Sequence, residues 1–128
     1  MDGYDLQDTL VRINYSGSFG ERQLIANIAK AEVLYKPTGD FVVVTAQQDN
    51  PQIHAAIKHM VNEKFPNCQG VYFVSGGEHT VAIKKAASIE RLKLKSFTDN
   101  NRKILATIKE LLPNVSLYVM TGSGRKKY

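Results

Sequence analysis

The chain has little cysteine and no long hydrophobic run, and both shortages exclude classes of protein. Its one cysteine, Cys68, cannot form an internal disulfide, so the fold cannot depend on disulfides. No hydrophobic run approaches the roughly 20 residues that a membrane-spanning helix needs. The first residues, MDGYD, lack the basic region and apolar core of a secretion signal. We therefore expect a soluble protein of the reducing cytoplasm, with no membrane partner.

Length and composition are those of one ordinary globular domain. The 128 residues can enclose a single hydrophobic core. Hydrophobic residues make up 43% and charged residues 23% of the chain, which excludes a disordered or membrane protein. No repeat or linker divides the sequence. We expect a folded domain over residues 1–121 and a basic, mobile tail over residues 122–128.

Positive charge is concentrated in the last third of the chain. Residues 84–128 contain eleven Lys and Arg residues but three acids, within a formal net charge of +5. Such a surplus favours anionic partners, namely nucleotides, nucleic acid or phosphoproteins. Lysines also line the solvated faces of amphipathic helices, so the pattern alone leaves both interpretations open.

Strand-like and helix-like segments alternate along the sequence. The strand patterns cover residues 41–44, 71–74, 95–98 and 115–120, and the helical patterns cover residues 21–34, 51–64, 81–92 and 104–112. Residues 3–6 are too short and polar to be assigned by pattern alone. Strands separated by helices of about 12–15 residues imply βαβ units. The prediction is an α/β three-layer sandwich with a mainly parallel, five-stranded, Rossmann-like sheet.

Polar side chains come directly after the predicted strands. In a parallel sheet, ligands bind beyond the carboxyl ends of the strands. Acids and hydroxyls that meet there can hold a hard cation and a phosphoryl group. Residues at strand ends also cap helices, so this pattern does not decide between the two roles. The residues are Asp5, Gln7, Thr45, Gln47, Ser75, Asp99 and Asn100.

Four segments resemble, in order and spacing, the motifs of the haloacid dehalogenase (HAD) superfamily. Residues 5–10 (DLQDTL) resemble the first motif, D-x-D-x-T, and residues 42–45 (VVVT) resemble the second, an apolar strand ending in Thr or Ser. Lys85 stands where the third-motif lysine is expected, and residues 97–101 (FTDNN) resemble the fourth, an apolar strand ending in paired acids. The resemblance covers nearly the whole chain. It leaves no room for a cap domain, which indicates a small, capless, phosphatase-like member.

The resemblance implies a role for each motif residue. Asp5 would be the nucleophile that accepts a phosphoryl group as an acyl phosphate. Thr45 and the backbone amide of Ala46 would hold phosphoryl oxygens. Lys85 would offset the negative charge and hold Asp5 in place.

The resemblance also implies a Mg²⁺ cofactor. Its ligands would be the carboxylates of Asp5 and Asp99 and the backbone carbonyl of Gln7. Asn100 would be an outer partner in place of the usual second acid, which should weaken the binding of Mg²⁺ without abolishing it.

The first motif departs from the family pattern at its acid/base. The family's second aspartate protonates the leaving oxygen and then activates water, but Gln7 stands there. Glutamine does not exchange a proton near neutral pH. We expect the side chain of the neighbouring Asp8 to point away from that of Gln7 and not to replace it.

Other candidates for a role in the site are weaker. His54 and His59 are five residues apart on a predicted helix, a poor spacing for one metal, and we expect packing or solvated side chains. His79 is expected in a loop, within approach of a substrate. Residues 17–20 (GSFG) fit the flap that follows the first motif in this family.

Three functions fit this pattern. The first is a Mg²⁺-dependent phosphatase-like hydrolase that acts slowly on a nucleotide or a nucleic-acid end phosphate. The second is a catalytically impaired binding module that holds or sequesters a phosphorylated ligand. The third, an assembly protein with a vestigial site, is disfavoured because the motif residues are retained. Capless members of the family act on large or exposed phosphates or close the site by oligomerising, so a homo-oligomer is a further expectation.

Overall fold

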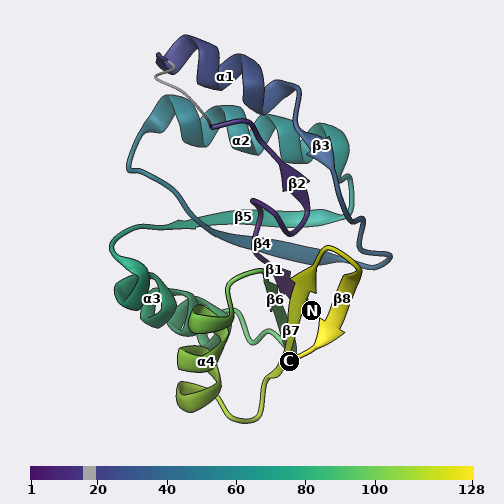
Figure 1. The fold of residues 1–128 in the computed structure, drawn as a ribbon, viewed down its shortest axis with the longest axis vertical. Coiled ribbons are helices and arrows are strands. Elements are labelled where there is room, and N and C mark those ends of the chain that lie inside the picture. Colours follow the sequence, from purple (N-terminus) through teal and green to yellow (C-terminus); the bar gives the residue numbers. More distant parts are fainter. Residues whose placement is uncertain (16–19) are drawn as a thin grey trace.

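The computed structural model describes residues 1–15 and 20–128 and has an α/β architecture built on a six-stranded sheet (Figure 1). The strand order is β5-β4-β1-β6-β7-β8; the first five strands are parallel and β8 runs antiparallel to β7. The strands are β1 (Asp2–Tyr4), β4 (Phe41–Ala46), β5 (Cys68–Val74), β6 (Ser96–Asp99), β7 (Ser116–Thr121) and β8 (Gly124–Lys127). The helices are α1 (Glu21–Ala29), α2 (Pro51–Lys64), α3 (Glu78–Arg91) and α4 (Arg102–Leu111).

Two asparagines fix where α2 and α4 begin. The side-chain oxygen of Asn50 accepts hydrogen bonds from the backbone amides of residues 52 and 53, at 3.0 and 3.1 Å. Asn101 does the same for residues 103 and 104 in α4. Each satisfies amides that the first turn of a helix leaves unpaired. The predicted start of the helix at Pro51 is confirmed.

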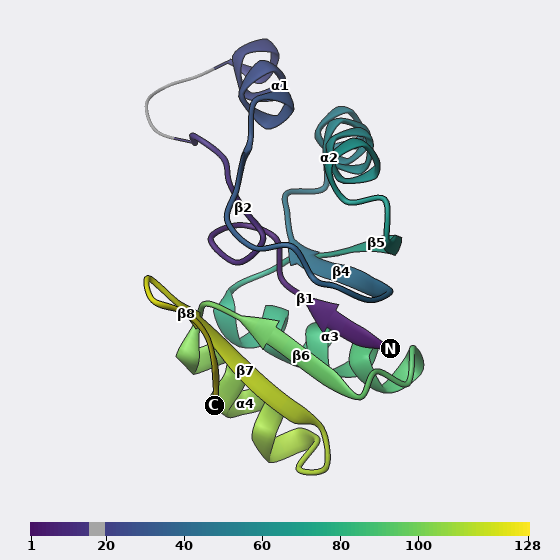
Figure 2. The same ribbon diagram turned by 90° about the vertical axis from the view of Figure 1, so that its right-hand side faces the viewer.

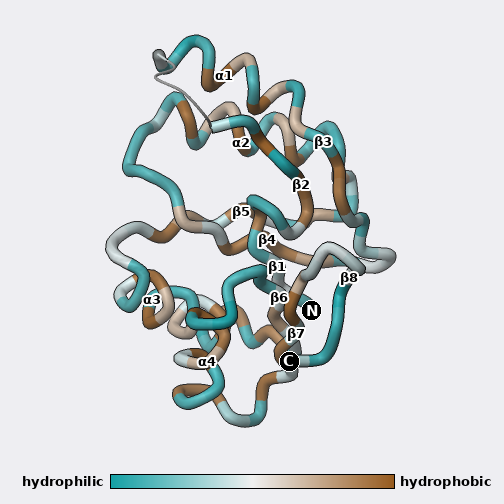
Figure 3. Tube along the Cα trace, in the orientation of Figure 1, coloured by the Kyte–Doolittle hydropathy of each residue, from teal (hydrophilic) through white to brown (hydrophobic). Residues whose placement is uncertain are grey.

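Strand β4 is buried on both faces, as its run of β-branched residues predicts. Phe41 and Val43 pack in one hydrophobic cluster with residues of α2. Val42 and Val44 pack in a second cluster with residues of α3 and α4. Helix α1 packs against α2 (Figure 2). Helices therefore cover both faces of β4. Hydrophobic residues recur along the strands of the sheet (Figure 3).

The short strand β1 has a glycine where neighbouring side chains pack closely against it. A Cβ atom at Gly3 would lie 2.6 Å from Cδ1 of Leu94 and 3.0 Å from Cδ1 of Phe97. Both neighbours are buried, so a side chain at position 3 would displace core atoms. The sequence pattern could not assign this strand, since the reason for its glycine lies in distant residues.

Two sequence predictions of structure are corrected. The sheet has six strands, not five, because residues 124–127 of the expected mobile tail form β8. The hairpin before β8 ends at Gly124, whose φ of 110° favours glycine. The helix predicted over residues 21–34 ends at Ala29. The remaining residues include β3 (Glu32–Val33), which pairs antiparallel with β2 (Val11–Arg12).

The flap expected at residues 17–20 falls almost wholly outside the described residues. Within the described part of the chain, no helix combines the length and hydrophobicity needed to cross a membrane.

Candidate functional site

The site lies where the order of strands reverses. The chain builds β4 and β5 on one side of β1 and then places β6 and β7 on the other. Tyr4 of β1 lies beside Val43 of β4 and Thr98 of β6. Asp5 and Asp99 therefore end adjacent parallel strands, at the position where open α/β sheets bind ligands.

Lys85 joins the two carboxylates into one cluster, which we call the acid–lysine cluster (Asp5, Lys85 and Asp99). Its ammonium nitrogen lies 3.1 Å from Oδ1 of Asp5 and 2.7 Å from Oδ2 of Asp99. Lys85 and Asp99 are each 1% exposed, and Asp5 is 8% exposed. Two carboxylates and one ammonium leave the cluster with one net negative charge when all three are ionised.

Burial and mutual attraction act in opposite directions on the cluster. Burial lowers the pKa of Lys85, but the charges of Asp5 and Asp99 more than reverse this, and the pKa is raised. The pKa of Asp99 is raised to about 6, chiefly by burial and then by the charge of Asp5, although Lys85 opposes both. The raised pKa means that Asp99 gains a proton in milder acid than an ordinary aspartate does.

The raised pKa of Asp99 predicts how stability depends on pH. The folded state keeps the proton of this carboxyl up to about pH 6, whereas the unfolded chain loses it near 3.8. The protonated Asp99 carboxyl therefore adds to the free energy of unfolding in full below pH 3.8, and this addition is lost as the pH rises through about 6. Urea unfolding at several pH values should show this fall in the wild type. The fall should be missing from the curve of the Asp99→Asn variant and should therefore appear in the difference between the two curves; a variant curve parallel to that of the wild type would contradict the assignment.

The second-motif residues lie at the same edge of the sheet. Thr45 is 1% exposed at the carboxyl end of β4, and Ala46, the last residue of that strand, is exposed. Asn100 follows Asp99 directly and is exposed. The Oδ1 atom of Asp99 accepts a hydrogen bond of 3.0 Å from the backbone amide of Asn101. Of the predicted site residues, the structure brings Asp5, Lys85 and Asp99 into direct contact and places Thr45, Ala46 and Asn100 at the same edge of the sheet.

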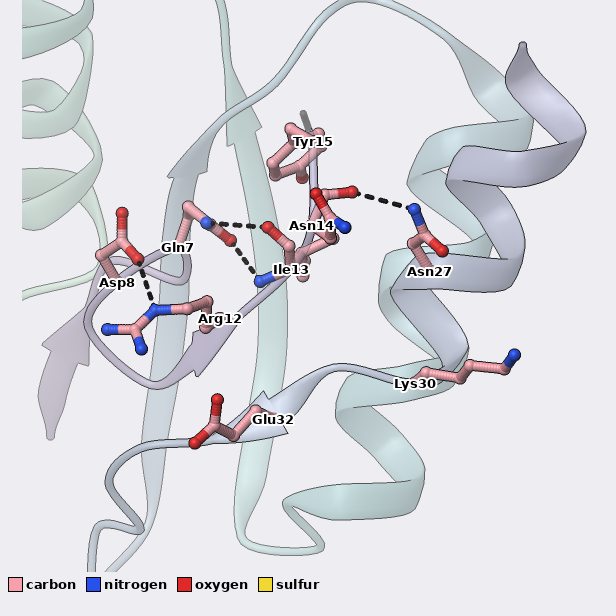
Figure 4. A pocket seen from close by; sticks show the side chains of 9 residues that line it. All are labelled: Gln7, Asp8, Arg12, Ile13, Asn14, Tyr15, Asn27, Lys30 and Glu32. Atoms are coloured by element: carbon pink, nitrogen blue, oxygen red, sulfur yellow. Dashed lines mark hydrogen bonds and ion pairs between the residues drawn. The ribbon is translucent and has the colours of Figure 1, made fainter. Parts of the chain in front are cut away.

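The side chain of Gln7 is occupied by the backbone of Ile13 (Figure 4). Its Oε1 accepts a hydrogen bond of 3.0 Å from the amide of Ile13, and its Nε2 donates one of 3.1 Å to the carbonyl of the same residue. An amide can make this pair of bonds because it is both donor and acceptor, whereas an aspartate is acceptor-only and one methylene shorter. Gln7 therefore anchors the segment after β2 beside the site.

Neither Asp8 nor the histidines take the place of an acid/base in the cluster. Asp8 lies 3.6 Å from Nε of Arg12 and has a φ of 60°, and both side chains are about half exposed. The ring of His54 stacks on Phe73 with 3.9 Å between centroids. His79 is exposed in the first turn of α3, where a loop was expected.

Sequence reasoning missed Tyr15 as a neighbour of the site. Gln47, after β4, donates a hydrogen bond of 3.4 Å to its hydroxyl. Burial raises the pKa of Tyr15, and the charge of Asp5 raises it further, so the phenol lies within electrostatic reach of the predicted nucleophile. No motif marks Tyr15, because its position depends on how the segment after β2 folds back.

Two cavities flank the acid–lysine cluster without being lined by it. The first, of about 550 Å³, lies between the β2–β3 pair and α1 and is the one in Figure 4. The second, of about 610 Å³, we call the hairpin cleft; its lining includes Asn100 and residues 120–122 and 124 of the β7–β8 hairpin. Asp8 and Arg12 line both cavities and separate them. Neither is lined by Asp5, Lys85 or Asp99, which fits the deep burial of the cluster.

The cluster contains two carboxylates, the type of donor that a hard cation prefers. Among the described residues, no three His, Cys, Asp or Glu side chains are grouped as metal ligands. Mg²⁺ is commonly held by one or two carboxylates with water and phosphate oxygens as the other ligands. Asp5 and Asp99 can supply two such carboxylates, since both contact the same ammonium group.

Comparison of the chain with protein families, with characterised proteins and with solved structures found no match in any of the three.

Proposed function

We propose that the chain is a Mg²⁺-dependent, phosphatase-like hydrolase that acts slowly on a nucleotide or nucleic-acid phosphate. In this proposal the fold is a capless, HAD-like three-layer sandwich with a degenerate first motif. The observation that supports it most strongly is the acid–lysine cluster, in which Lys85 contacts Asp5 and Asp99 at the point of strand reversal. Four separate sequence motifs predict residues at this one edge of the sheet.

Each residue has a chemical role that its position supports. Asp5 attacks the phosphorus atom through a carboxylate oxygen, forming an acyl phosphate as the leaving oxygen departs. Lys85 neutralises one of the negative charges that meet there and holds the Asp5 carboxylate in place. Thr45 and the amide of Ala46 hold phosphoryl oxygens at the end of β4.

Mg²⁺, when bound by Asp5 and Asp99, would neutralise charge on the phosphoryl group. Gln7 offers no proton to the leaving oxygen and takes none from water. Transfer to Asp5 then depends on a leaving group that needs no protonation, and release of the phosphate from Asp5 is slow.

The proposal is tested by the mass of the intact protein after reaction. Incubation with Mg²⁺ and an aryl phosphate should add the mass of one phosphoryl group, because the acyl phosphate forms faster than it is hydrolysed. Asp5→Asn should gain nothing under the same conditions, and peptide mapping should place the group on Asp5. An unmodified wild-type protein, or a phosphoryl group on another residue, would refute the assignment of the nucleophile.

One observation favours the binding module as the second candidate. Both hydrogen-bonding atoms of the Gln7 amide are bound to Ile13, so this residue already has a structural role. A protein that only holds a phosphorylated ligand needs a stable cradle and no acid/base. It would bind the ligand tightly with Gln7 in place and more weakly after Gln7→Asp, because the new carboxylate would repel the phosphate.

A further inference from the structure

Helices leave one face of β6, β7 and β8 uncovered. Helix α4 packs behind these strands, and Figure 2 shows the opposite face with no helix in front of it. Leu117 and Val119 of β7 point into the core shared with α4, so Tyr118 and Met120 lie on the uncovered face. We call this surface the open face; it is formed by Tyr118, Arg125 and Lys127, and the buried residues Thr98 and Met120 lie beside them.

Arg125 is held rigidly on the open face. Its guanidinium lies 3.6 Å from the ring centroid of Tyr118, and its Nε donates a hydrogen bond of 3.1 Å to the hydroxyl of Thr98. No carboxylate of the described residues forms an ion pair with it. Its two terminal nitrogens make no hydrogen bond to the described residues. A fixed, unpaired guanidinium is well suited to bidentate binding of a phosphate.

Lys127 adds a second positive charge on the same face. Its nitrogen lies 4.9 Å from the ring centroid of Tyr118, and Lys127 is the direct cross-strand partner of that tyrosine. Two side chains that are two residues apart on a strand are separated by roughly 6.6 Å. This spacing is comparable with that of neighbouring phosphates on an extended nucleic-acid strand. Lys126, between them, points to the other side of the sheet.

The hairpin cleft adjoins the open face and lies near the acid–lysine cluster, although no residue of that cluster lines it. Met120 lines the cleft and is the cross-strand partner of Arg125. At the other end of the cleft lies Asn100, next in sequence to Asp99. Leu34, Tyr35 and Met120 give the cleft an apolar and aromatic wall, which suits a nucleobase, and its volume of about 610 Å³ accommodates one nucleotide.

We propose that the open face binds the backbone of a single-stranded nucleic acid, with Arg125 and Lys127 holding successive phosphates and the hairpin cleft holding a base. A basic surface beside an aromatic wall is the arrangement that binds single strands with little sequence preference. Placing the end of that strand in the acid–lysine cluster rests on the proposed function, but binding of the strand to the open face does not.

Fluorescence anisotropy with a single-stranded oligonucleotide that carries no terminal phosphate tests this inference. The wild-type chain should bind it, and its affinity should decrease as salt is added. In a plot of log binding constant against log salt concentration, the magnitude of the slope should fall by about 0.7 for each phosphate contact removed. Arg125→Gln should weaken binding roughly tenfold or more, since a charge-assisted contact is lost. Lys127→Gln, at an exposed position, should reduce the magnitude of the salt slope by about 0.7 without risk to folding.

Lys126→Gln is the matched control, because it removes the same charge from the same strand but on the opposite face. It should leave affinity nearly unchanged. Compared with Arg125→Gln, Arg125→Lys should restore the salt slope, because the charge is kept. It should restore only part of the affinity, because the planar guanidinium that binds a phosphate through two hydrogen bonds is lost. No binding by the wild type, equal losses in the Lys126 and Lys127 variants, or equally tight binding of a polyglutamate peptide would overturn the inference.

The same experiment separates this inference from the proposed function. Oligonucleotide binding without a terminal phosphate requires no chemistry at Asp5. If the strand binds through Arg125 but an aryl phosphate never modifies Asp5, the proposed function fails and the open face stands. If Asp5 is phosphorylated but the oligonucleotide does not bind, the inference about the open face fails and the proposed function stands.

Discussion

Replacing Gln7 with aspartate should raise the hydrolysis of an aryl phosphate in Mg²⁺ by about 10²–10⁴-fold, the usual contribution of a general acid/base. The new carboxylate stands two residues after Asp5, where it can activate the water that attacks the acyl phosphate. An aspartate is too short and lacks the donor to reproduce both bonds of Gln7 to Ile13, so its carboxylate is free to turn toward the substrate. Steady-state release of the aryl alcohol measures the gain.

Gln7→Asn is the matched control for this substitution. Asparagine has the length of aspartate and should lose the same contacts with Ile13, at a cost of about 1–3 kcal/mol in stability, but it supplies no acid/base. It should therefore show no gain in rate. Adding Asp5→Asn to Gln7→Asp should remove the gain, because the nucleophile is gone. Equal rates for wild type and Gln7→Asp would contradict the role assigned to position 7.

Replacing Lys85 with methionine should lower the free energy of unfolding by about 3–5 kcal/mol near neutral pH. The substitution keeps much of the side-chain volume but leaves Asp5 and Asp99 as two buried carboxylates with no cation between them. Without Lys85, burial and the charge of Asp5 raise the pKa of Asp99 unopposed, so an ionised Asp99 beside Asp5 becomes costly near neutral pH. Urea unfolding at pH 7 should give the loss directly.

Lys84→Met provides the comparison at the neighbouring position. Lys84 is exposed and donates one hydrogen bond of 2.9 Å to the carbonyl of Ser75, so its loss should change stability by about 0.5 kcal/mol or less. Adding Asp5→Asn and Asp99→Asn to Lys85→Met should restore much of the stability, because the buried charges are removed. If Lys85→Met were as stable as Lys84→Met, the cluster would not be a buried ion network.

Much of the fold follows from local sequence patterns. The run of β-branched residues in β4 and the Asn50-Pro51 start of α2 each specify their element without reference to distant parts of the chain. Strand β8 could not be predicted in this way. Its residues, GRKK, carry charges typical of a tail, yet they pair with β7, where Arg125 and Lys127 lie over the ring of Tyr118.

In the candidate site, too, some features follow from sequence patterns and others do not. The meeting of Asp5 and Asp99 was expected, since parallel strands place their carboxyl ends at one edge, and the resemblance implied that Lys85 holds Asp5. The shorter contact of Lys85 with Asp99 was not predicted. The engagement of Gln7 with Ile13 and the approach of Tyr15 to the site depend on a segment with no regular pattern. Spacing in sequence says nothing about where such a segment folds back, so only the structure reveals these neighbours.

The central claim is that Asp5 and Asp99 form one cation site, and Mg²⁺-dependent thermal unfolding tests it most directly. At a Mg²⁺ concentration about 100-fold above the dissociation constant, binding to the folded state should add about 2.7 kcal/mol to stability. Asp5→Asn and Asp99→Asn should each abolish the increase caused by Mg²⁺, whereas Asp8→Asn, which removes a neighbouring acid paired with Arg12, should keep it. An increase that persists in the Asp5→Asn, Asp99→Asn double variant, or is missing from the wild type, would contradict the account.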